Sequence, residues 1–127
     1  LRSHPLRLLR AQLSHKKLLT AAQMADYPSG RLVRACGIVT MRQRPQTAKG
    51  VVFVTLEDET GSVNVIVWKA VKERFRQEVY QSRLLAVYGV WQRDEDSGGE
   101  VRHVIAKRLV DLTPMLGALS TTSRDFH

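Results

Sequence analysis

Three consecutive carboxylates, Glu57, Asp58 and Glu59, form a compact group of possible metal ligands. A divalent metal for phosphoryl transfer needs carboxylates that converge on one rigid site, usually from different elements. Consecutive residues of an extended chain point to opposite sides, so Asp58 would point away from its two neighbours. A tight turn explains the same residues, with Asp58 accepting backbone N–H groups and Gly61 supplying a left-handed conformation. We therefore predict a structural turn here and no metal site.

Other groups that commonly carry catalysis show no matching pattern. Asp94, Glu95 and Asp96 belong to "DEDSGGE", a stretch typical of a solvated loop, and these acids would repel a phosphate backbone. The single cysteine, Cys36, has no companion at metal-ligand spacing, and we interpret it as a small buried apolar residue. A phosphate-binding glycine loop and a nucleophile turn are not found. The histidines without ligand spacing are His4, His15, His103 and His127. We predict no catalytic residues and no cofactor; an independent nuclease or tRNA-related enzyme is the disfavoured alternative.

Positive charge is concentrated in the first part of the chain. The net charge is +8 and the pI is near 10.3. Residues 1–56 hold ten Lys/Arg against one acid, Asp26, whereas the remaining residues hold ten Lys/Arg against eleven acids. A surplus confined to one part of the chain favours a surface that faces a polyanion, with nucleic acid as the first choice. A solvated basic face and an acidic protein partner are the alternatives.

The apolar pattern separates a helical arm from a single β-rich domain. In the arm, residues 1–30, Leu6, Leu9 and Leu13 recur at helical spacing, and Thr20 is placed to cap a second, shorter helix over residues 21–25. "DYPSG" then breaks the chain. Residues 31–112 are predicted to form the domain, and residues 113–127 a tail rich in Ser and Thr. With 127 residues and no apolar run of about 20, we expect one domain that does not enter a membrane, in a cytoplasmic protein.

Five short strands and one helix are predicted within the domain. The strands are "RLVRACGIVTMRQR", "GVVFVTLED", "SVNVIVW", "RLLAVYGVWQR" and "VRHVIAKRLVDL". Residues 69–80 carry Val71, Phe75 and Val79 on one helical stripe between the third and fourth strands. Glycines in the first and fourth strands suit the sharp curvature of a small barrel. This order is that of the OB-fold, a mainly β, five-stranded Greek-key barrel. An SH3-like barrel or an open five-stranded α+β sheet is the runner-up.

Strand alternation predicts which side chains of the second and third strands face outward. The aliphatic residues Val52, Val54 and Leu56 form the better core face, matched by Val63, Val65 and Val67. The outer face then carries two aromatic rings, a hydroxyl and an amide. These residues are Phe53, Thr55, Asn64 and Trp68.

Aromatic rings on an exposed sheet beside a basic rim can bind a single strand, because bases stack on the rings while cations follow the phosphates. We predict that Arg42, Arg44 and Lys49 form this rim around the loop between the first two strands. The alternative is that the leucines of the arm cover Phe53 and Trp68, which would make both rings core residues.

The hairpin "VVFVTLEDETGSVNVIVW" resembles that of OB domains in general, including the anticodon-binding domains of class II aminoacyl-tRNA synthetases. The wider run "RQRPQTAKGVVFVTLEDETG", with "LLAVYGVWQR", "HVIAKRLVDL" and the terminal "SRDFH", is similar to the C-terminal region of the bacterial error-prone C-family DNA polymerase. "HPLRLLR" resembles the segment that precedes the OB domain there. The likeness covers nearly the whole chain. Glu57 departs from the synthetase pattern, which often has a basic residue at that outward position.

This resemblance implies an OB domain cut from a longer polymerase, a relative of the DNA polymerase III α subunit that works in damage-induced mutagenesis and translesion synthesis. The chain's start at Leu1, without methionine, agrees with a piece of a longer protein. The catalytic aspartates of the family lie far upstream, so the chain itself is not expected to be an enzyme. The implied function is binding of single-stranded template DNA, in a bacterial, nucleoid-associated setting. The alternative is a module that docks accessory mutagenesis or replication proteins: an inactive Y-family-like polymerase subunit and, through it, the sliding clamp.

Overall fold

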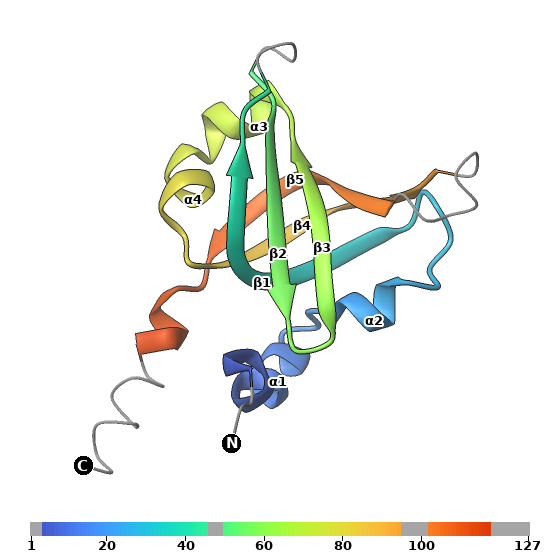
Figure 1. The fold of residues 1–127 in the computed structure, drawn as a ribbon, viewed down its shortest axis with the longest axis vertical. Helices are drawn as coiled ribbons and strands as arrows, with labels where there is room; N and C mark the ends of the chain where they lie inside the picture. Colours follow the sequence, from blue (N-terminus) through green and yellow to red (C-terminus); the bar gives the residue numbers. More distant parts are fainter. Residues whose placement is uncertain (1–3, 46–49, 95–101, 118–127) are drawn as a thin grey trace.

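The computed structural model describes residues 4–45, 50–94 and 102–117, and within them the chain forms a closed five-stranded barrel (Figure 1). The strands are β1 Leu32–Gln43, β2 Val52–Asp58, β3 Gly61–Val67, β4 Leu84–Arg93 and β5 Arg102–Asp111. Their order around the barrel is β1-β2-β3-β5-β4; β3 and β5 are parallel, and the other pairs are antiparallel. The predicted OB-fold is therefore confirmed.

Four named helices accompany the barrel in the described ranges, and residues 114–117 form a further helical turn after β5. They are α1 Pro5–His15, α2 Ala21–Met24, α3 Lys69–Arg74 and α4 Arg76–Gln81. The single helix predicted over residues 69–80 is divided in two, because Phe75 leaves helical geometry with φ −117° and ψ 40°. Its apolar stripe still faces the barrel, where Val79 is buried and Phe75 packs against the core. None of the helices in these ranges is long and apolar enough to cross a membrane.

Alternating side chains of β2 and β3 fill the barrel as predicted. Val52, Val54 and Leu56 are at most 2% exposed, and Val65 and Val67 are fully buried. Burial of these aliphatic groups supplies the main driving force for folding, at about 1.5–3 kcal/mol for each side chain. The outer residues of the same strands are half-buried or exposed, so the assignment of faces is confirmed.

Two glycines sit where the barrel closes most tightly. A Cβ atom on Gly37 would lie 2.8 Å from the Cβ of Leu56, and one on Gly89 would lie 2.1 Å from the carbonyl oxygen of Ile105. Gly89 also adjoins an irregularity in the register of β4 against β5. Close approach of neighbouring backbones therefore requires glycine at both corners, in agreement with the sequence.

The helical arm packs against the outside of β1 and β4. Leu6, Leu9 and Leu13 form a second apolar cluster with Cys36 and with residues at the start of β4. Cys36 is 3% exposed, and burial raises the pKa of its thiol to about 12. The prediction of a small buried apolar residue is confirmed, whereas the alternative that these leucines cover the outer face of β2 and β3 is wrong.

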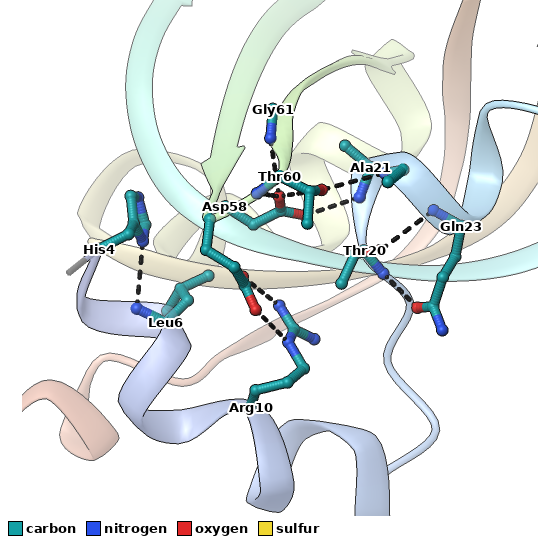
Figure 2. Close-up of polar contacts among 11 residues, drawn as sticks. His4, Leu6, Arg10, Thr20, Ala21, Gln23, Asp58, Thr60 and Gly61 are labelled. Carbon is teal, nitrogen blue, oxygen red and sulfur yellow. Dashed lines mark hydrogen bonds and ion pairs between the residues drawn. The ribbon is translucent and has the colours of Figure 1, made fainter.

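The turn between β2 and β3 holds the second helix of the arm (Figure 2). Asp58 is 5% exposed. Its Oδ1 accepts hydrogen bonds from the backbone N–H of Thr60 and Gly61 and from the Thr60 hydroxyl, at 2.7–3.1 Å. Its Oδ2 accepts one from the N–H of Ala21 at 2.7 Å. One carboxylate oxygen thus closes the turn, and the other caps α2. Gly61, at the end of the turn, has a positive φ of 155°.

The short helix α2 is stabilised because each N–H of its first turn has an acceptor. Ala21 donates to Asp58, Ala22 donates to the Thr60 hydroxyl at 3.0 Å, and Gln23 donates to the Thr20 hydroxyl at 3.0 Å. The Gln23 side chain in turn accepts from the Thr20 N–H, which completes a capping box. The predicted cap at Thr20 is confirmed, and two further caps come from the β2–β3 turn.

Glu59 and Glu57 hold the first helix of the arm. Arg10 of α1 donates through Nε and Nη2 to the two carboxylate oxygens of Glu59, at 2.6 and 2.7 Å. This paired hydrogen bond lowers the pKa of Glu59 and raises the pKa of Arg10. His4 Nδ1 accepts from the N–H of Leu6 at 3.1 Å, and its Nε2 lies 3.2 Å from Glu57. Each of the three acids thus binds the arm.

We expect Asp58→Ala to lower the free energy of unfolding by about 3 kcal/mol, since four hydrogen bonds to a buried, charged acceptor are lost. Urea unfolding at neutral pH measures this change, and hydrogen exchange should show faster opening of α2. Glu57→Gln is the matched control, because the Glu57 side chain is 52% exposed and should cost less than about 0.5 kcal/mol. Equal stability of the Asp58→Ala and Glu57→Gln variants would contradict the capping role.

Glu59→Gln should lower stability by about 1–2 kcal/mol at neutral pH through loss of the charged pair with Arg10. Because the pKa of Glu59 is lowered in the folded state, its contribution is complete above the unfolded value of about 4.3. It is lost as the pH falls through the lowered folded pKa. Unfolding curves of wild type and variant should therefore converge in acid, and a difference that persists there would refute the pair.

Candidate nucleic-acid interface

The outer face of β2 and β3 brings four of the predicted site residues together. Phe53 lies opposite Ile66, and Thr55 lies opposite Asn64, in the antiparallel register. The Thr55 hydroxyl donates to the side-chain oxygen of Asn64 at 3.3 Å. Phe53 and Thr55 are half-buried, and Asn64 is exposed. An apolar ring and a polar pair thus lie side by side on an open sheet. We call this surface the β2–β3 platform.

Trp68 stands at the upper end of the platform, where β3 leads into α3. It occupies the N-cap position of α3 and is 52% exposed. Its indole ring is therefore available to a ligand. The arm does not reach Trp68 or Phe53, because α1 and α2 lie at the other end of β2 and β3 (Figure 1).

A bulge in β1 turns Arg42 away from the platform. The register of β1 against β2 shifts between Val39 and Met41, which places Met41 opposite Thr55 and Arg42 opposite Val54, a core residue. The Arg42 guanidinium donates to the carbonyl of Val79 at 2.6 Å and to that of Ser82, at the end of α4. Arg42 thus closes the end of a helix, and the structure does not bring it to the rim.

Sequence reasoning missed two residues of β1 that belong to the platform. Met41 is 50% exposed and Gln43 lies opposite Phe53, so both extend the outer face beyond β2. Strict alternation along β1, without the bulge, assigns Met41 and Gln43 to the inner side of the barrel. Alternation alone could therefore not have identified them as platform residues. A bulge within a polar strand end has no distinct sequence signature here.

The rim retains other cations. Arg44 is exposed, with its guanidinium carbon 5.7 Å from the centre of the Tyr80 ring, and Arg76 approaches the same ring at 5.8 Å. The side chain of Lys69 lies against Gly50, at the end of the loop between β1 and β2. Lys49 lies outside the described residues. Arg76 and Lys69 were missed because the helix that carries them was interpreted only through its apolar stripe.

The platform continues onto β5. Parallel pairing places His103 beside Asn64, and its Nε2 lies 3.1 Å from the side-chain oxygen of Gln92 on β4. Burial lowers the pKa of His103, which favours its neutral imidazole. A hollow of about 330 Å³ adjoins Asn64 between β3 and α2, and Arg102 lines it. Polar groups and a cation therefore border the platform beside Asn64.

The comparisons with known proteins agree with this geometry. The family described as the OB-fold nucleic acid binding domain matches residues 33–112. An asparaginyl-tRNA synthetase from Pyrococcus horikoshii shares the fold with a TM-score of 0.60 and 25% identity, over 74% of this chain and 22% of that one.

Much closer sequence relatives are long proteins. The chain is 58% identical over all 127 residues to an error-prone DNA polymerase of Ralstonia nicotianae, and 57% identical over 127 residues to that of Ralstonia pickettii. It spans 11% of the length of each relative. The resemblance to the error-prone polymerase drawn from the sequence is confirmed. With a family model over residues 33–112 and a closed five-stranded barrel, the chain belongs to the OB-fold nucleic acid binding domains.

Proposed function

We propose that this OB domain binds single-stranded DNA across the β2–β3 platform. The observation that carries the proposal is that the arm, held by the turn at Asp58, leaves the half-buried ring of Phe53 and the exposed indole of Trp68 uncovered. Bases would stack on the rings, and stacking is tolerant of sequence because every base has a flat aromatic face.

Polar contacts would fix the strand on the platform. Thr55 and Asn64 offer a hydroxyl and an amide to base edges or sugars. Arg44 and Lys49 would contact phosphates, together with Arg76 at the same end. Glu57, at the opposite end of β2, disfavours a phosphate there. The strand would therefore follow the cationic end and leave the anchored turn free.

We infer that the parent protein is an error-prone DNA polymerase, because the relatives that match the whole chain carry that name. The catalytic residues would lie in the larger part of the protein, and this domain would guide single-stranded template in damage-induced synthesis. The domain adds affinity for the strand and is not itself an enzyme in this proposal.

A protein-docking role is the second candidate, and the exposed side chains of Met41 and Trp68 favour it. Such a surface could receive an accessory subunit of the polymerase, with contact to the sliding clamp through that subunit. Salt dependence separates the two roles. For DNA, the logarithm of the binding constant falls linearly with the logarithm of the salt concentration, because counterions are released on binding. No binding to oligo-dT at low salt would leave protein docking as the better account.

Replacing Phe53 by Leu should weaken binding of oligo-dT by about 1–3 kcal/mol, because Leu fills similar space but offers no ring. Phe53→Tyr is the matched control, and it should retain affinity close to that of the wild type. Fluorescence anisotropy measures both. Equal affinities of the Leu and Tyr variants would show that Phe53 does not stack on a base.

Arg44 and Arg42 should respond differently to the same substitution. Arg44→Gln removes a phosphate contact, so the salt slope of oligo-dT binding should fall by about 0.7. Arg42→Gln removes hydrogen bonds to the end of α4, so it should lower the unfolding midpoint and leave the salt slope unchanged. A smaller slope for Arg42→Gln than for Arg44→Gln would reverse the assignment of the rim.

A further inference from the structure

A groove of about 570 Å³ lies on the side of the barrel away from the β2–β3 platform. Tyr88 of β4, Leu32 at the start of β1 and the end of the arm line it. In the strand order β1-β2-β3-β5-β4, β4 pairs only with β1 and β5. It is therefore the strand farthest around the barrel from the β2–β3 hairpin. Leu32 is 75% exposed, so this part of the groove is open to solvent.

Four of the ten residues that line the groove are cations, and none is an acid. The cations come from three segments of the sequence: Lys17 of the arm, Arg31 and Arg34 at the start of β1, and Lys107 of β5. The two ion pairs found among the described residues, His4 with Glu57 and Arg10 with Glu59, do not involve them. Their charge is thus not neutralised by those pairs and is available to an anion.

Tyrosine rings hold the guanidinium groups in position. Arg34 lies opposite Tyr88 in the β1–β4 register, and Arg108 lies opposite Tyr88 in the β4–β5 register. Their guanidinium carbons are 5.5 and 5.3 Å from the centre of that ring. Arg31 lies 4.1 Å from the centre of the Tyr27 ring. Because the rings already carry cations, the groove suits phosphate groups better than stacked bases.

Lys17 contributes its charge from a strained backbone position. It has φ +64°, the one positive φ among the described residues other than glycine. The N–H of Leu18 donates to the carbonyl of Leu13 at 3.0 Å, which ends α1 in the motif where glycine is usual at this position. A lysine here places an ammonium at the groove where glycine would suit the backbone better.

We propose that this groove is a second nucleic-acid site, which binds the phosphodiester backbone of a strand. The site is separate from the platform, and it does not depend on stacking by Phe53. Lys17, Arg31 and Arg34 account for a part of the N-terminal charge surplus that lies outside the platform rim. Cations that form no ion pair with the described residues, with guanidiniums held over rings, are complementary to a chain of phosphates. Two faces of one small barrel would then hold two segments of nucleic acid.

The test is the triple variant Lys17→Gly, Arg34→Gln, Lys107→Gln in the 127-residue chain. Lys17→Gly removes charge while relieving the positive φ, so the fold should persist, which a thermal melt checks. Anisotropy titrations with oligo-dT and with a duplex of equal length, each at several salt concentrations, give the salt slopes. We expect the oligo-dT slope to fall by about 2, because each lost phosphate contact contributes about 0.7.

A matched control removes the same number of charges elsewhere. Arg7, Lys16 and Arg83 are exposed and do not line the groove, so their triple substitution to Gln should leave the slope near the wild-type value. A fall in the salt slope that occurs in the groove variant alone supports the site. The DNA with which the slope falls, oligo-dT or the duplex, shows which form the groove holds. Equal slopes for the two triple variants, on both DNAs, would overturn the proposal and leave the groove to an acidic protein segment.

These variants test the platform proposal and the groove proposal independently. Phe53→Leu should weaken oligo-dT binding at every salt concentration with little change in slope, because stacking releases few counterions. If Phe53→Leu binds normally while the groove variant loses slope, the platform is wrong and the groove stands. If only Phe53→Leu loses affinity, the groove is wrong and the platform stands.

Discussion

The carboxylate of Asp58 is the constraint on which the arrangement of this domain depends. It closes the β2–β3 turn with one oxygen and caps α2 with the other. Arg10 and Glu59 fix α1 beside the same turn. The arm is thereby held at one end of the barrel, with its leucines against β1 and β4.

Holding the arm in this place divides the barrel surface into two faces with different properties. The platform carries a half-buried phenyl ring, an exposed indole and a polar pair, whereas the groove carries cations over tyrosine rings. The arm also completes the groove, since Lys17 and Leu19 line it. The same anchoring thus exposes one face and builds the other, which links the stability of the turn to both proposed contacts with nucleic acid.

Local patterns in the sequence predicted much of the fold. Alternation identified the inner valines of β2 and β3, and Thr20 identified the start of α2. The bulge at Val39 to Met41 was not predictable, because it depends on how β1 passes from pairing with β4 to pairing with β2. Arg42 was assigned to the rim from its place next to the loop between the first two strands, and the bulge turns it elsewhere. The groove was also missed, since Lys17, Arg34 and Lys107 meet only when the barrel closes.

The central claim is that the anchored arm leaves the β2–β3 platform open to single-stranded DNA. A titration of the isotope-labelled chain with oligo-dT, followed by backbone amide NMR, tests it directly. The account predicts the largest shifts in Val52–Asp58 and Gly61–Val67, with the backbone amides of α1 after Pro5 unchanged. Shifts confined to α1 and α2, with β2 and β3 unperturbed, would contradict it.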